Sequence, residues 1–174
     1  MNDVAQQYFF SPTKGTLVFS DVLTDILQES QCYPDQAIRI SVGTDSEEFG
    51  SAAKYVTIIH LWRVGHGARA YRTETTENFS GGDRRGQARF RQRIWKEILM
   101  TAMLAQELRS ALRDAQQQGH LDAIEVHADV GARGGSSVMI REVIGVLKGY
   151  GFADAVIKLK PDAYAASAVA DHYI

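Results

Sequence analysis

Hydrophobic and polar residues alternate along three successive stretches of the chain. In the first stretch, Ile38, Ile40 and Val42 recur at every second position, which is the period of a strand with one strongly apolar face. Short links, such as Gly65-His66-Gly67, join the stretches. The pattern predicts an antiparallel meander of three strands at residues 38–48, 55–64 and 68–77.

The second half of the chain alternates between helical and strand periods. Helical spacing over 87–117 is followed by a strand at 123–130, a helix capped by Ser136 or Ser137, a strand at 155–159 and a small-residue helix at 163–173. Each β-α-β crossover makes its two strands parallel. We therefore expect an α/β fold with a five-stranded mixed sheet, in which strands 1–3 are antiparallel and strands 4–5 parallel, with helices on both faces.

The 174 residues fit one domain over 1–174. Residues 1–35 form its N-terminal part, an irregular segment around Pro12 and Gly15 followed by a helix at 21–30 that Ser20 can cap. No apolar run approaches 18 residues, and the first residues lack the pattern of a signal peptide. We expect a soluble, cytoplasmic protein.

Asp45 ends the first strand of the meander, on the less apolar face with Arg39, Ser41 and Gly43. A carboxylate at the end of a buried strand is costly unless a cation meets it. Asp129 repeats this placement at the end of the fourth strand. Two carboxylates brought together by adjacent strands call for a metal, and oxygen ligands without thiolates favour Mg²⁺ or Mn²⁺. The alternative for Asp45 is an ordinary turn-forming residue.

Two further acidic residues come from helices. Glu97 lies at the edge of the apolar face of the long helix, near its start, and Glu107 is its competitor. Asp171 lies in the last helix, whose alanines allow a close approach to the sheet, and Asp162 is its competitor as an N-cap after Pro161. His60 and His127 lie within strands and are interpreted as hydrogen-bonded core residues.

A cationic block precedes Glu97. It comprises Arg84, Arg85, Arg89, Arg91, Arg93 and Lys96, with no acidic residue among them. Such a block can contact phosphates even though the formal net charge of the chain is −2, or it can be a solvated helix face. Cys32 is the single cysteine, which excludes an intramolecular disulfide and a thiolate zinc site.

Several segments together resemble the YkuK-type family of predicted ribonuclease H-like nucleases. They are Phe10-Ser11-Pro12-Thr13-Lys14-Gly15, Gly43-Thr44-Asp45-Ser46, His127-Ala128-Asp129-Val130-Gly131, 140–145, 160–167 and Val169-Ala170-Asp171. The resemblance implies a ribonuclease H-like fold in which Asp45, Glu97, Asp129 and Asp171 hold two divalent metal ions.

Two functional hypotheses follow. The first is a nuclease that hydrolyses phosphodiester bonds of RNA, DNA or a hybrid with Mg²⁺ or Mn²⁺, using the arginines of the block, Arg84, Arg85, Arg89, Arg91 and Arg93, to position the nucleic acid backbone. The second is a ribonuclease H-like module that binds nucleic acid or protein without turnover. An ATPase of the actin-like type shares the strand order, but its doubled domain is too large for this chain.

Overall fold

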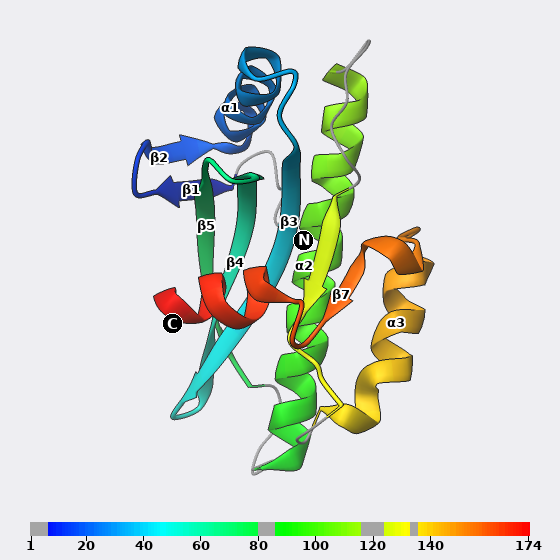
Figure 1. Cartoon of the computed structure of the whole chain (residues 1–174). Helices are drawn as coiled ribbons and strands as arrows, with labels where there is room; N and C mark the ends of the chain where they lie inside the picture. The colour runs from blue at the N-terminus through cyan, green and yellow to red at the C-terminus, as the bar shows by residue number, and fades with distance from the viewer. Residues whose placement is uncertain (1–6, 80–85, 116–123, 133–135) are drawn as a thin grey trace.

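A mixed sheet of seven strands forms the centre of the molecule (Figure 1). The computed structural model describes residues 7–79, 86–115, 124–132 and 136–174. The strand order is β2-β1-β5-β4-β3-β6-β7. The strands are β1 (Tyr8–Ser11), β2 (Gly15–Val18), β3 (Ile38–Phe49), β4 (Ala52–Arg63), β5 (Gly67–Asn78), β6 (Glu125–Ala128) and β7 (Ile157–Leu159).

The predicted meander is confirmed. β3 and β4 are antiparallel over their full length, from Ile38 opposite Arg63 to Phe49 opposite Ala52, and β4 pairs with β5 in the same way. The parallel arrangement of the last two strands is also confirmed, because β6 is parallel to β3 and β7 is parallel to β6. β3 therefore lies between its antiparallel hairpin partner and the parallel part of the sheet.

The expected count of five strands was wrong, and the strand order differs with it. The segment expected to be irregular forms a hairpin, in which β1 pairs with β2 along its length and with β5 through Phe10 and Arg72. Pro12 and Gly15 lie at its turn, where Gly15 has a φ of +76° that suits a residue without a side chain. Two four-residue strands are too short for their alternation to stand out in the sequence.

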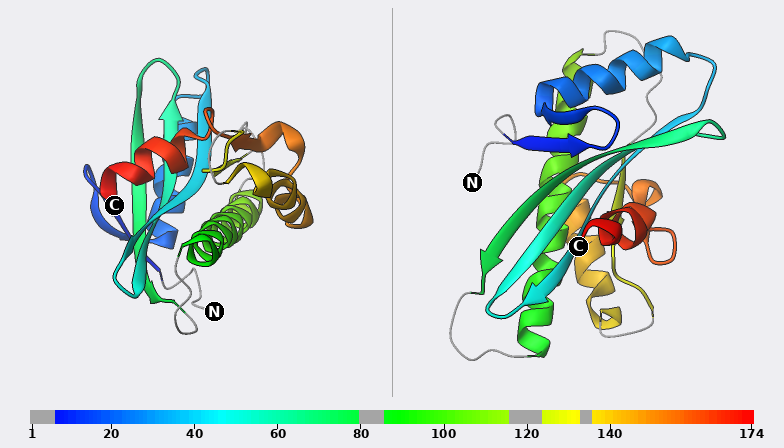
Figure 2. Two further views of the ribbon diagram at one scale, coloured as in Figure 1. Left: turned by 90° about the horizontal axis from the view of Figure 1, so that it is seen from below. Right: turned by 90° about the vertical axis from the view of Figure 1, so that its left-hand side faces the viewer.

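Helices cover both faces of the sheet (Figure 2), as expected. α1, α2 and α3 lie on one face, and the C-terminal helical segment crosses the other. That segment is a π-helix followed by a 3-10 turn, rather than one regular helix. In chain order, the helices are α1 (Phe19–Cys32), α2 (Gln87–Ala115), η2 (Ser137–Met139), α3 (Ile140–Gly149), η3 (Asp154–Val156), η4 (Ala165–Ala170) and η5 (Asp171–Tyr173).

α1 begins one residue earlier than the expected cap at Ser20. Its N-cap is Val18, whose backbone N–H donates to the Asp21 carboxylate at 3.2 Å. Ser136 precedes η2 without a side-chain cap hydrogen bond. In the part of the chain that the structure describes, no helix is long and apolar enough to cross a membrane.

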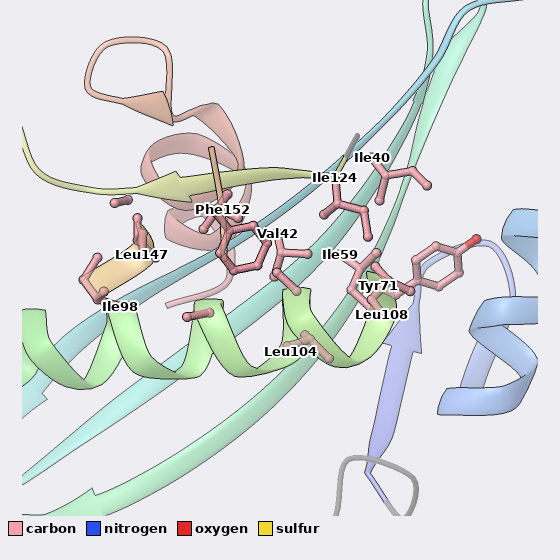
Figure 3. Close-up of a cluster of buried hydrophobic side chains, with 14 of the residues drawn as sticks. Ile40, Val42, Ile59, Tyr71, Ile98, Leu104, Leu108, Ile124, Leu147 and Phe152 are labelled. Carbon is pink, nitrogen blue, oxygen red and sulfur yellow. The ribbon is translucent and has the colours of Figure 1, made fainter. Parts of the chain in front are cut away.

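The main core lies between α2 and the sheet (Figure 3). Ile40 and Val42 of β3 face Ile98 and Leu108 of α2, as the strand period predicts. The odd-numbered residues of β3, such as Gly43, therefore face η4. There the approach is so close that a β-carbon on Gly43 would lie 2.5 Å from the backbone nitrogen of Ala166. Gly43 thus permits the C-terminal helix to cross β3 next to Asp45.

Candidate functional site

The site forms where β3 extends past its parallel neighbour. The β3–β6 ladder ends at Gly43 and His127, whereas β3 continues to Phe49. Asp45 lies on this extension, and Asp129 follows β6 directly. Because β6 has ended, side chains from both faces of the sheet can approach this edge of β3.

Asp45 is half-buried and close to other acidic groups. One of its oxygens accepts a 2.8 Å hydrogen bond from the backbone N–H of Ser46. Burial raises the pKa of Asp45 to about 6; the Ser46 amide opposes that rise, and the charges of Asp129 and Asp171 reinforce it. The interpretation of Asp45 as a mere turn residue does not fit its position inside β3.

Glu97 of α2 approaches the same edge from the opposite face. Its side chain is 2% exposed and accepts a 2.5 Å hydrogen bond from the Ser46 hydroxyl. Burial raises the pKa of Glu97 to about 8; the Ser46 hydroxyl and Arg93 lower it, while Asp45 and Asp129 raise it. Glu97 is therefore largely protonated at neutral pH in this state. One turn further along α2, the Thr101 hydroxyl donates to that of Thr44 at 2.8 Å and fixes the helix on β3.

Lys160 supplies a cation to this cluster. Its ammonium nitrogen lies 2.8 Å from Asp129 Oδ1, and that hydrogen bond raises the pKa of Lys160. Asp45 and Asp171 also interact electrostatically with Lys160. The Lys160 side chain is 49% exposed, so it can leave Asp129 without unfolding the site.

Sequence reasoning missed Lys160 and the role of Ser46. In the parallel ladder Ala128 pairs with Leu159, so the next residues, Asp129 and Lys160, become neighbours. The register of β6 and β7, which makes the two residues neighbours, cannot be read from the sequence. Ser46 had a visible signal, because it lies on the α2 face of β3, two residues beyond Thr44.

The structure distinguishes each of the two helical carboxylates predicted for the site from its alternative in the sequence. Glu107 is exposed on α2. Glu97 is buried, and the charge of Asp45 raises its pKa. Asp171 is exposed but acts electrostatically on Asp45, whereas Asp162 lines a different cavity. The structure thus places Asp129 and Asp171 within electrostatic reach of Asp45, and Asp45 and Asp129 within reach of Glu97. Their roles in catalysis and metal binding stay predictions.

These carboxylates suit a hard divalent cation in donor type and charge. Asp129 and Asp171 act electrostatically on Asp45, and Asp45 and Asp129 act on Glu97. Lys160 opposes these charges at Asp45, and Arg93 opposes them at Glu97. Burial is the main cause of the raised pKa values of Asp45 and Glu97, and the neighbouring carboxylates add to it. Within the described residues, no three acidic, histidine or cysteine side chains are already placed to hold a metal ion. The donor set fits such an ion, but binding it requires side-chain movement.

The cationic block is partly neutralised by the chain's own acidic residues. Arg89 donates to Glu48 at 2.8 Å and to the Gly50 carbonyl at 3.0 Å, and Arg91 lies 3.3 Å from Glu142. Arg93 acts electrostatically on Glu97 and lowers its pKa. Arg84 and Arg85 lie outside the described residues. Partly exposed ion pairs contribute little stability, so Arg89 and Arg91 can exchange partners at low cost.

Of the two strand histidines, His127 is a hydrogen-bonded core residue, as interpreted from the sequence, whereas His60 is half-buried and its Nδ1 has no hydrogen-bond partner among the described residues. His127 is buried; its Nδ1 accepts a 3.0 Å hydrogen bond from the Ala165 backbone N–H, so Nε2 donates to Glu125 at 3.2 Å. His60 is part of the same layer, with its ring edge-on to Tyr164. Burial lowers the pKa of both rings. His127 therefore orders the start of η4, the segment that leads to Asp171.

Comparisons with known proteins agree with this architecture. A family model described as ribonuclease H-like matches residues 21–174. The "Uncharacterized protein YkuK" of Bacillus subtilis (strain 168) is 24% identical over 177 residues, covering 95% of this chain and 95% of that protein. No solved structure gives a significant match. The chain belongs to the ribonuclease H-like family, in its YkuK-type branch.

Proposed function

We propose that this protein is a divalent-metal-dependent nuclease whose site is formed by Asp45, Glu97, Asp129 and Asp171. The observation that carries the proposal is that carboxylates from separate elements act on one another beside β3: Asp129 and Asp171 on the half-buried Asp45, and Asp45 and Asp129 on the buried Glu97. Carboxylates gathered at this energetic cost are typical of sites that bind Mg²⁺ or Mn²⁺. Membership of the ribonuclease H-like family supports the same activity.

The divalent ions would activate a water molecule and stabilise the leaving oxygen of the phosphodiester. The residues of the chain prepare the site for them. The Ser46 amide donates to Asp45 and the Ser46 hydroxyl donates to Glu97, so one residue links the two carboxyl groups. Lys160 holds Asp129 in place, and its half-exposed ammonium is available to a substrate phosphate.

The arginines of α2 provide a route for the nucleic acid backbone. Arg89 and Arg91 lie on the same helix as Glu97, and their present partners Glu48 and Glu142 can be replaced by phosphates. Contacts of this kind hold the backbone without reading base sequence. The proposal therefore includes RNA, DNA and hybrid substrates.

The test is cleavage of labelled single-stranded RNA, single-stranded DNA, duplex DNA and an RNA–DNA hybrid with Mg²⁺ or Mn²⁺. Asp45→Asn should lower the cleavage rate by about a thousandfold or more, because it removes a charged ligand from the centre of the site. Glu107→Gln, an exposed change on the same helix as Glu97, should leave the rate unchanged.

Two results would contradict the proposal. One is metal-dependent cleavage by purified Asp45→Asn at the wild-type rate, which would mean that another site or a contaminant is responsible. The other is tight binding of a substrate by the wild type without cleavage under any metal condition. That result would favour the non-catalytic binding module.

A further inference from the structure

A polar cavity lies on the η4 side of the sheet, away from the four carboxylates. Its volume is about 590 Å³, within the range of small-molecule sites. Arg39 and Lys158 contribute cationic groups, Glu125 and Asp162 contribute carboxylates, and Tyr164 and Pro161 add ring surfaces. We propose that this cavity binds a nucleoside monophosphate.

The cationic side of the cavity suits a phosphate group. Arg39 is exposed and has no ion-pair partner among the residues that the structure describes. Its guanidinium lies 5.6 Å from the ring centre of Trp62, which limits its freedom. Lys158 donates to the Ala155 carbonyl at 2.9 Å and is 3.9 Å from Glu125, so its remaining hydrogens can turn to a ligand. A guanidinium and an ammonium together complement a phosphate dianion.

The acidic side suits the sugar and base of a nucleotide. Glu125 Oε2 is occupied by His127 Nε2, and Glu125 Oε1 has only the long 3.9 Å ion pair with Lys158, whereas Asp162 is exposed without an ion pair in the described ranges. Carboxylates accept hydrogen bonds from ribose hydroxyls and from base amino groups. Inorganic phosphate cannot make these additional hydrogen bonds, so the lining favours a phosphate ester over the free ion.

The aromatic wall of the cavity is already fixed in place. The Tyr164 hydroxyl accepts a 3.4 Å hydrogen bond from Ser41, and its ring meets that of His127 edge-on, with centroids 4.5 Å apart. Neighbouring rings of His60 and Trp62 also pack edge-on against Tyr164. Little side-chain freedom would be lost when a ligand binds, which favours affinity.

The cavity is separate from the carboxylate site. η4 crosses β3 at Gly43, with Arg39 on one side of the crossing and Asp45 on the other. Asp45 lies six residue steps along β3 from Arg39, which corresponds to roughly 20 Å. A nucleotide in the cavity therefore needs no metal and does not compete for Asp45, so the proposal stands independently of nuclease activity.

The test is calorimetric titration of the metal-free protein in EDTA with AMP and CMP. Saturable binding is expected for the wild type, and the double variant Arg39→Ala/Lys158→Ala should bind at least thirtyfold more weakly. Arg141→Ala, an exposed arginine on α3 outside the cavity, should bind like the wild type. Asp45→Asn should also bind AMP normally, which distinguishes this cavity from the nuclease site. Thermal melting verifies that each variant is folded.

The remaining ligands decide the chemical class. Adenosine and inorganic phosphate should each bind at least tenfold more weakly than AMP, and ribose 5-phosphate should be intermediate. Equal affinity for phosphate and AMP would overturn the nucleotide assignment. The absence of saturable binding by either nucleotide, or unchanged binding in the folded double variant, would overturn the site itself.

Discussion

Two clusters of charged residues in this protein differ in how well their charges are balanced. Around Asp25 of α1, the Tyr71 hydroxyl donates at 2.6 Å, Arg69 at 2.8 Å, and Lys14 lies 3.2 Å away. Burial alone would raise the pKa of Asp25, but these three partners outweigh it and lower the pKa. The Asp25 cluster is therefore a stabilising one.

The cluster around Asp45 is the reverse case. Burial raises the pKa of Asp45 to about 6 and that of Glu97 to about 8, and neighbouring carboxylates reinforce both increases. A folded protein gains nothing from such an arrangement by itself. The contrast teaches that a raised pKa is not a general property of buried acids in this fold. It is a feature of one site.

The largest expected effect is a loss of stability in Asp25→Asn. Removing this carboxylate leaves Lys14 and Arg69 without their main partner, which should lower the free energy of unfolding by about 3 kcal/mol at pH 7. Because the folded-state pKa of Asp25 is lowered, its contribution exists above the unfolded-state pKa and is lost as the pH falls. The difference from wild type should therefore shrink toward pH 3.

Urea unfolding measures this effect, with Asp45→Asn as the matched control. At pH 7 to 8, Asp45→Asn should be as stable as the wild type or more stable, because it removes charge repulsion. Equal destabilisation by the two substitutions would contradict the distinction between the clusters.

The next effect is the pH dependence caused by Glu97. The unfolded chain ionises this group near its ordinary pKa, whereas the folded chain does so at about 8. Between those values the unfolded state binds fewer protons, so the stability of the wild type falls as the pH rises. Glu97→Gln lacks this cost and should be more stable than the wild type by on the order of 2 kcal/mol at pH 8, but not at pH 4.

Unfolding curves at several pH values in EDTA test this prediction. Glu107→Gln should follow the wild type at every pH, since Glu107 is exposed. Parallel curves for Glu97→Gln and the wild type would show that Glu97 is not held in a raised-pKa state.

A smaller effect concerns the cation that the site already contains. Lys160 pairs with Asp129 at 2.8 Å and therefore competes with an incoming divalent ion. Lys160→Met should tighten Mn²⁺ binding by roughly three- to tenfold, the equivalent of about 1 kcal/mol. Lys148→Met, which removes an exposed lysine of α3 that pairs with Asp154 at 2.8 Å, is the control. Weaker Mn²⁺ binding in Lys160→Met would mean that Lys160 supports the site instead.

The sequence predicted those features that depend on local periodicity. Ile38, Ile40 and Val42 identified β3 and its buried face, and hence the opposite orientation of Asp45. The equivalent placement of Asp45 and Asp129 followed from parallel neighbours, because such strands end at the same edge of a sheet. These were the firmest elements of the site because one repeating pattern defined each of them.

Other features depended on pairing between distant segments and could not be predicted. The β1–β2 hairpin was concealed by short strands and by Pro12 and Gly15. Lys160 joined the site only through the register of β6 and β7. The nucleotide-sized cavity likewise requires Arg39, Lys158 and Tyr164, which come from three separate segments, to meet across the sheet.

The most direct test of the central claim is Mn²⁺ binding at pH 8, followed by electron paramagnetic resonance or calorimetry. If the four carboxylates form one metal site, the wild type should bind Mn²⁺ saturably and Asp45→Asn at least tenfold more weakly, while Glu107→Gln should match the wild type. Equal Mn²⁺ affinity in wild type and folded Asp45→Asn, or no binding by the wild type, would contradict the claim.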